Sequence, residues 1–285
     1  GDLPRATSLI ERFREELMTM FYSYTGWERS IVKVIAKLGG EASGVSALEK
    51  IGNIEMAPER NVLTKNVAKQ WIAELEGVKA LVEKQANGEA SAEIRDLHQR
   101  ALALHDGMLS RVSALLSILY EDYGDVVLQE TLIEVMQPGA MDPEGVLPVR
   151  DKVLSIMHFT RSHLLPFKVI EDAEKITFMP DPCPSGARLI QGGHYEAPRS
   201  NAIVKGRSPL TYGREDLPVY CCHEPAMEMG SAIKFGVPMF IVDAPEDVGI
   251  TPCKIYVYKN PVDIPDKYYE RLGLKKPEDL IATSG

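Results

Sequence analysis

The chain has 285 residues, of which 45% are hydrophobic and 26% are charged, and its formal net charge is −9. These values are typical of globular proteins and exclude a chain that is mainly disordered. A net negative charge repels phosphate backbones, so nucleic acid is not expected as a partner. No apolar run approaches the roughly 18 residues of a membrane span, and the first residues show no signal-peptide pattern. We therefore expect a cytoplasmic protein without a membrane partner.

Residues 7–136 carry the pattern of amphipathic helices. Apolar residues recur at three- and four-residue steps, the spacing that places them on one face of a helix, and Gly39-Gly40 interrupts the pattern. The expected helical segments lie around 9–21 and over 30–38, 62–85, 91–123 and 125–136. Because such helices bury their apolar stripes against one another, the sequence predicts a helical bundle domain over 1–136. The long stripes also allow a homo-oligomer through this half.

A segment rich in proline and glycine, 137–146, is the predicted linker to the second half of the chain. After it we expect a helix over 148–165. Two apolar segments, 167–170 and 175–179, flank an acidic turn and predict a β-hairpin. Strands therefore enter the fold only after the linker.

The next stretch, 180–217, is rich in glycine, proline, serine and arginine and is expected to be a long loop. The elements expected after it are a strand over 218–222, a helix over 224–235, strands over 238–242 and 253–258, and a short helix over 265–272. The predicted fold class is therefore α+β. An N-terminal helical bundle precedes a C-terminal antiparallel-sheet domain, 147–285, with one or two helices.

All four cysteines lie in the second half, and two of them belong to the sequence Tyr220-Cys221-Cys222-His223-Glu224. Thiolate and imidazole are the preferred ligands of zinc, and they also bind iron. The free N–H groups at the start of a helix favour the thiolate form. If the strand predicted before this helix persists, Cys221 shares a face with His223, and Cys222 shares the other face with Glu224.

Donors from separate segments predict a centre for one zinc or iron ion. The predicted ligands are Cys183, Cys221, His223, Asp243 and Cys253. Asp243 follows a buried strand, where a carboxylate can enter a site as a ligand or base, or can belong to a solvated acidic turn. The cysteines can instead be small buried hydrophobic residues.

Acid–base and substrate-binding groups are expected around the same centre. The candidate catalytic residues are His223, Glu224, His194 and Cys222. His194 lies beside flexible glycines, where a histidine can be a ligand, a proton shuttle or a plain surface residue. The candidate substrate-binding residues are Arg188, Arg214 and Tyr212. Arginine holds a carboxylate through paired hydrogen bonds, so the expected substrate or ligand is a small molecule that bears a carboxylate.

Two further pairs of histidines lie on predicted helices. His98 and His105 are seven residues apart and share a face, and Asp106 lies beside His105. This arrangement favours a polar stripe over a metal site. His158 and His163 are separated by about 140° around a helix and do not share a face, although either can look toward the domain interface.

From Cys221 onward, a cysteine at a helix start is followed by glycines, a buried strand over 238–242, an acidic turn and Cys253 before the last strand. This order resembles the end of vinyl-reductase-type small-molecule-binding domains. It is also similar to L-2-amino-thiazoline-4-carboxylic acid hydrolase-like proteins, which share a helices-then-strands layout. In sensors with a vinyl-reductase-type domain, cysteines and an acidic residue of this region hold zinc beside a small aromatic ligand. The resemblance implies Cys221 or Cys222, Asp243 and Cys253 as ligands.

The chain also departs from that pattern. Pro245 stands where those domains often have another cysteine, the stretch 180–217 is longer, and His223 and Glu224 add an imidazole and a carboxylate. The added acid–base groups favour catalysis over sensing, so the sequence predicts a metal-dependent hydrolase or lyase that acts on a small organic acid. Two alternatives stay open: a small-molecule sensor module with a structural zinc, and a metal-free hydrolase with a cysteine nucleophile.

Overall fold

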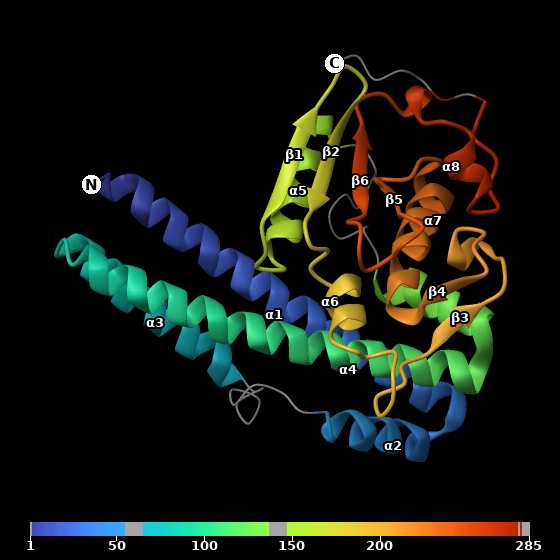
Figure 1. Ribbon diagram of the computed structural model, residues 1–285, viewed down its shortest axis with the longest axis horizontal. Coiled ribbons are helices and arrows are strands. Elements are labelled where there is room, and N and C mark those ends of the chain that lie inside the picture. Colours follow the sequence, from blue (N-terminus) through green and yellow to red (C-terminus); the bar gives the residue numbers. More distant parts are fainter. Residues whose placement is uncertain (1, 55–64, 137–146, 279, 281–285) are drawn as a thin grey trace.

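The computed structural model describes residues 2–54, 65–136, 147–278 and 280, and the predicted linker lies outside them. In the first half, long helices run side by side with a shorter one across their end (Figure 1). Their bounds are α1 (Leu3–Gly39), α2 (Glu41–Gly52), α3 (Lys65–Glu83) and α4 (Asn87–Val135). The break predicted at Gly39-Gly40 is confirmed, because Gly40 separates α1 from α2. Its φ is 88°, a value that residues with a Cβ atom rarely adopt. The segments expected around 9–21 and over 30–38 form one continuous helix, α1.

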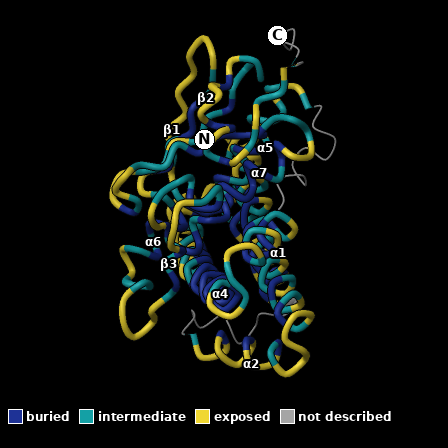
Figure 2. The backbone as a smooth tube through the Cα atoms, turned by 90° about the vertical axis from the view of Figure 1, so that its right-hand side faces the viewer, coloured by how far each residue is buried: buried dark blue, intermediate teal, exposed yellow. Residues whose placement is uncertain are grey.

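Helix α4 is the centre of the molecule. Gly124 leaves the helical conformation inside it, at φ 84° and ψ 178°, so the two helices predicted on either side of residue 124 meet at a kink. Residues 107–119 are all buried, so the middle of α4 is drawn in dark blue in Figure 2, whereas its first turns carry many exposed residues. By length and composition α4 is the one described helix that could cross a membrane, and 78% of its most apolar window is buried inside the protein. The core helix of a globular protein has the same properties.

The second half begins with α5 (Val149–Arg161) and contains an antiparallel sheet. Its strands are β1 (Phe167–Glu171), β2 (Lys175–Pro180), β5 (Ile241–Asp243) and β6 (Lys254–Tyr258), in the order β1-β2-β6-β5. The predicted hairpin is confirmed, with Phe167 opposite Pro180 in the β1–β2 pair. The fold is therefore α+β, with a helical N-terminal half and a four-stranded antiparallel sheet in the C-terminal half.

Two expectations for the middle of this half are wrong. The stretch 180–217 is not one long loop, and 218–222 is not a strand. The elements found there are α6 (Gly186–Gln191), β3 (Ile203–Lys205), η3 (Pro209–Thr211), β4 (Asp216–Pro218) and η4 (Val219–Cys222), followed by α7 (His223–Phe235). The chain ends with η5 (Pro261–Asp263) and α8 (Lys267–Glu270).

The turn η4 changes which neighbouring side chains share a side. Cys222 and His223 already have helical backbone angles, so η4 runs directly into α7. Residues three apart lie on the same side of such a backbone, whereas alternate residues do so in a strand. Cys221 is therefore grouped with Glu224, and Cys222 turns into the core, where it is fully buried.

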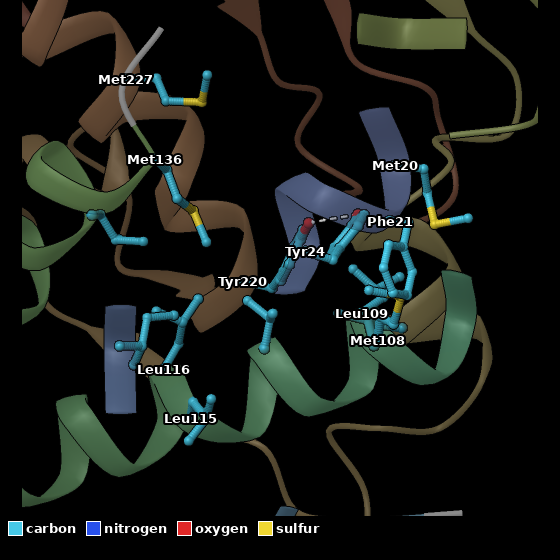
Figure 3. Close-up of a cluster of buried hydrophobic side chains, with 14 of the residues drawn as sticks. Met20, Phe21, Tyr24, Met108, Leu109, Leu115, Leu116, Met136, Tyr220 and Met227 are labelled. Atoms are coloured by element: carbon cyan, nitrogen blue, oxygen red, sulfur yellow. Dashed lines mark hydrogen bonds between the residues drawn. The ribbon is translucent and has the colours of Figure 1, made fainter. Parts of the chain in front are cut away.

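One cluster of buried hydrophobic side chains joins the two halves. Leu109 and Leu116 of α4 belong to it together with Tyr220 of η4 and Met227 of α7 (Figure 3). At its centre the hydroxyl of Tyr24 in α1 lies 3.2 Å from the hydroxyl of Tyr220. Polar groups from the helical half thus reach the segment that carries the cysteines.

Candidate functional site

Two adjoining cavities lie where α5, α7 and the loop after β2 meet. Their volumes are about 60 Å³ and about 20 Å³. The side chains that line both cavities are Cys183, Ser185, His223, Glu224 and Cys253. These residues come from the loop before α6, the start of α7 and the segment before β6. The tertiary structure therefore gathers four of the polar residues singled out in the sequence.

The smaller cavity adds Cys221 to this set. Gly186 makes the close approach of α6 to Cys221 feasible, because a Cβ atom at this position would lie 2.6 Å from the sulfur. A volume of about 20 Å³ holds one body of the size of a water molecule. The smaller cavity thus combines three thiols, an imidazole and a carboxylate around a space of ionic size.

Burial controls the state of the thiols. It raises the pKa of Cys221 well above its usual value, and the nearby Cys183 and Cys253 raise it further. Burial also raises the pKa of Cys253, with added contributions from Cys183 and Glu224. Both groups are therefore protonated thiols in the absence of a cation, which disfavours a metal-free nucleophile. A bound metal ion reverses this balance, because metal ligation requires and stabilises thiolates.

The donors are of the right kind but do not form a finished metal site. In the part of the chain that the structure describes, no three side chains of His, Cys, Asp or Glu are arranged to hold a metal ion. The fit to zinc or iron therefore rests on the chemistry of the donors and on their common cavity.

His223 and Glu224 form a second feature of the shared wall. His223 Nδ1 lies 2.6 Å from the carbonyl oxygen of Tyr220, and Nε2 lies 3.2 Å from Glu224 Oε1. Burial lowers the pKa of His223, but the charge of Glu224 and its hydrogen bond outweigh burial, so the pKa is raised overall. The pair therefore favours a proton on His223 at the edge of both cavities.

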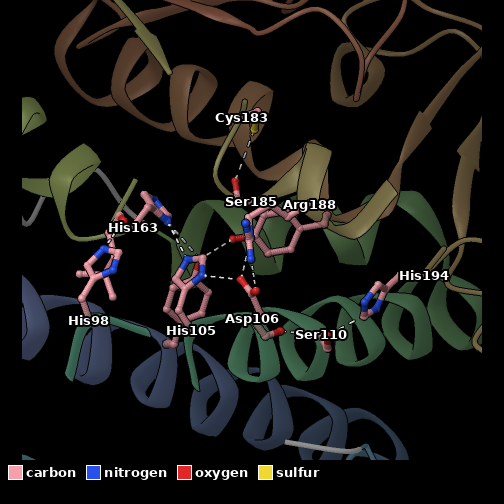
Figure 4. Close-up of polar contacts among 12 residues, drawn as sticks. His98, His105, Asp106, Ser110, His163, Cys183, Ser185, Arg188 and His194 are labelled. Carbon is pink, nitrogen blue, oxygen red and sulfur yellow. Dashed lines mark hydrogen bonds and ion pairs between the residues drawn. The ribbon is translucent and has the colours of Figure 1, made fainter. Parts of the chain in front are cut away.

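The larger cavity is also lined by His163, which follows α5. His163 Nδ1 lies 3.1 Å from His105 Nε2 in α4, and the hydroxyl of Tyr24 lies 3.4 Å from the first atom and 3.3 Å from the second. His105 Nδ1 lies 3.1 Å from Asp106 Oδ1, and Arg188 makes two hydrogen bonds to the same carboxylate (Figure 4). These residues form a second polar group, which begins at the larger cavity.

Sequence reasoning missed this second group. It interpreted His105 with His98 as a polar stripe, although His105 is fully buried and His98 bonds the carbonyl of Leu164. The available signal was the position of His105, which stands inside the most apolar helix of the chain and directly before an aspartate. The suggestion that His163 can look toward the interface of the two halves is confirmed by its contacts with Tyr24 and His105.

For these two histidines burial outweighs the other effects on the pKa. It lowers the pKa of His105 despite the adjacent Asp106, and it lowers the pKa of His163 further, with help from His105 and His223. Both are therefore neutral imidazoles at neutral pH. Burial also raises the pKa of Tyr24, which stays protonated.

Three of the predicted catalytic and metal-binding residues lie away from both cavities. Cys222 is buried in the core with its sulfur 3.8 Å from the carbonyl oxygen of Pro218, and burial raises the pKa of its thiol. Asp243 accepts a hydrogen bond of 2.9 Å from the hydroxyl of Tyr256. His194 lies 3.4 Å from Ser110. Cys222 lies away from the cavities because the helical turn η4 directs its side chain to another side than that of Cys221.

His194 lines a separate pocket of about 320 Å³, together with Asp106 and Arg188, which we call the outer pocket. Arg188 is engaged by Asp106 there. Arg214 donates hydrogen bonds of 2.6 Å to the carbonyl oxygens of Pro245 and Glu246. Neither arginine lines the two inner cavities, so the structure does not bring the predicted carboxylate clamp to them.

Tyr212 does line the smaller cavity. Its hydroxyl donates a hydrogen bond to Glu228, a buried carboxylate that also accepts from Arg271 and from the backbone N–H of Val242. Arg271 stacks over the ring of Tyr212 at 4.0 Å. This network fixes the ring of Tyr212 as a wall of the smaller cavity.

Comparison of the chain with family models, with curated proteins and with solved structures gave no match in any of the three. The resemblance of the segment after Cys221 to vinyl-reductase-type domains therefore stays a prediction.

Proposed function

We propose that this protein holds one thiophilic metal ion, zinc or iron, at the smaller cavity and acts on a small organic molecule in the larger cavity as a hydrolase or lyase. The observation that carries the proposal is the wall that the two cavities share. Cys183, Cys253, His223 and Glu224 face both spaces, so groups that suit a metal and groups that suit proton transfer adjoin one small chamber.

The ligand set follows from the donors of the smaller cavity. Cys183, Cys221 and Cys253 are the three thiols, and either His223 or Glu224 completes four ligands. A bound zinc or iron ion supplies Lewis-acid polarisation of a carbonyl or activation of a water molecule. Asp243 is not part of this set, because its carboxylate is held by Tyr256 outside the cavity.

The chain itself supplies acid–base groups and a dry chamber. Whichever of His223 and Glu224 is not a ligand lies at the cavity edge and can deliver a proton to a leaving group. Phe159, Met227 and Phe240 line the larger cavity and limit the entry of water. A volume of about 60 Å³ restricts the occupant to a small molecule. Arg188 and Arg214 have no part in this proposal, because their partners lie elsewhere.

A binding module with a structural zinc is the second candidate. The observation that favours it is that the smaller cavity offers five donors, enough to close a tetrahedral site without an open position. Cobalt substitution separates the two functions. A change of the cobalt absorption spectrum on addition of azide indicates an open position and supports the enzyme, whereas no change supports the structural site.

Metal analysis of the purified chain tests the proposal itself. We expect about one zinc or iron per chain after metal loading, with loss of the metal in Cys221→Ser and Cys253→Ser. Cys222→Ala is the matched control, because this thiol lies beside the site in sequence but lines neither cavity. If the wild-type protein contains no metal after the loading step, or if the control loses as much metal as the two cysteine variants, the proposal is overturned.

A further inference from the structure

A line of hydrogen-bonded side chains crosses the core from the outer pocket to the larger cavity. Asp106 lines the outer pocket, and its side chain is 37% exposed. His105 is fully buried and lies 3.1 Å from Asp106 on one side and 3.1 Å from His163 on the other. His163 lines the larger cavity. Figure 4 shows this sequence of contacts between α4 and the segment after α5.

The contacts determine where the protons lie. Asp106 is a carboxylate held by Arg188, so His105 donates from Nδ1 and its Nε2 carries a lone pair. His163 Nδ1 faces this lone pair at 3.1 Å, and two lone pairs at that distance would repel. His163 therefore carries its proton on Nδ1. The other ring nitrogen of His163, Nε2, is left without a proton and can accept one.

A buried polar network of this kind is expensive unless each member is satisfied, since desolvation of imidazole and phenol groups opposes folding. Tyr24 satisfies part of it, because its hydroxyl lies within 3.4 Å of both histidines and contacts Tyr220. Hydrogen bonding of the buried groups does not by itself explain the two ends of the line. One end is an ionised carboxylate at the outer pocket, and the other is an unprotonated nitrogen of a residue that lines the larger cavity.

We propose that Asp106, His105 and His163 form a proton relay between the outer pocket and the larger cavity. A proton released by a molecule in the cavity binds His163 Nε2, and the proton on His163 Nδ1 passes to His105 Nε2. The proton on His105 Nδ1 passes to the carboxylate of Asp106, from which it leaves through the outer pocket. One proton enters and one leaves, no electrons are exchanged, and the reverse sequence supplies a proton. The use of this proton by a cavity molecule rests on the proposed function, whereas the relay itself does not.

The test is nitrogen NMR of the full chain, labelled on its histidines and without added ligand. It reports the protonated nitrogen of each ring and the exchange of its proton with water. Wild type is compared with Asp106→Asn, which keeps an acceptor oxygen but cannot take up a proton. Arg188→Met is the matched control, because it removes the arginine and leaves the contact between Asp106 and His105. His98, which bonds the carbonyl of Leu164 at 2.8 Å, is the internal reference.

We expect His105 and His163 to carry their protons on Nδ1 in wild type, and we expect His105 to keep a proton on Nδ1 in Arg188→Met, where Asp106 still accepts from it. In Asp106→Asn we expect either proton exchange at His163 that is slower by about tenfold or more, or a shift of the His105 proton to Nε2. Either result shows that the carboxylate of Asp106 controls the position or the exchange of the protons on His105 and His163. A proton on Nε2 of His163 in wild type, or protons and exchange in Asp106→Asn that match wild type, would overturn the relay. A metal-free or inactive protein leaves this result unchanged, so failure of the proposed function is seen separately.

Discussion

Two polar groups meet at the larger cavity, and the pKa values of their histidines are shifted in opposite directions. His105 and His163 are neutral because burial lowers the pKa of each. His223 is equally buried, yet Glu224 raises its pKa. The difference lies in the carboxylates. Arg188 shares the carboxylate of Asp106, whereas the described residues give Glu224 one ion-pair partner, His223.

This comparison shows how one cavity obtains both an acid and a base from the same type of side chain. Burial lowers the pKa of an imidazole, a neighbouring carboxylate raises it, and a cation that shares the carboxylate weakens that second effect. Pairs of titratable groups whose environments separate their pKa values are typical of acid–base catalysis.

The largest effect is expected from His105→Leu, which removes the centre of the neutral group. The substitution leaves the Nδ1 proton of His163 with only the long contact to Tyr24 in a buried position, so we expect a loss of about 2–3 kcal/mol in the free energy of unfolding. Urea unfolding measures it. His98→Leu is the control and should lose about 1 kcal/mol, because its single hydrogen bond lies at a part-buried site. Equal losses would contradict the special position of His105.

The pair of His223 and Glu224 is expected to stabilise the fold only at lower pH. Because the folded state raises the pKa of His223, its contribution is present below the unfolded value of about 6.5 and is lost as pH rises through the folded pKa. Glu224→Gln should therefore be less stable than wild type by about 1–2 kcal/mol near pH 6, and this gap should shrink toward about pH 9. Unfolding curves across this range measure the gap, and a constant gap would show that His223 is not charged.

The contribution of His163 to the free energy of unfolding should depend on pH in the reverse way. Because the folded state lowers the pKa of His163, its contribution is present above about pH 6.5 and is lost as pH falls. In His163→Gln, which cannot titrate, we expect a deficit of about 1–2 kcal/mol near pH 8 that shrinks toward about pH 5. The same unfolding curves serve, and a deficit that grows on acidification would refute the neutral state of His163.

The smallest effect is expected from Gly186→Ala, which acts on the thiol side alone. The new Cβ would lie 2.6 Å from the sulfur of Cys221 and must displace it, so zinc affinity should fall about tenfold, or about 1.4 kcal/mol. Competition with a zinc chelator measures it. Gly77→Ala is the control, since nothing lies within 4 Å of a Cβ there and zinc affinity should not change. The NMR signals of His105 and His163 should stay in place, and a shift of those signals would show that the two sides are not independent.

Much of the fold follows from local patterns. Three- and four-residue spacing of apolar side chains predicted the long helices, and the acidic turn between apolar segments predicted the β1–β2 hairpin. The prediction failed for η4, because a short apolar segment such as Val219 to Cys222 carries no period by which to tell a strand from a helical turn. That error reversed the grouping of Cys221 and Cys222.

Local residue patterns indicate the long helices, the β1–β2 hairpin and the side chains available in the second half of the chain, which are thiols, imidazoles and carboxylates. Which of these side chains share a cavity follows from the tertiary structure. His105 meets His163 across 58 residues and Tyr24 across 81, contacts that no local pattern contains. It also decided their charge, because burial and the neighbouring charges that set a pKa come from segments far apart in the chain.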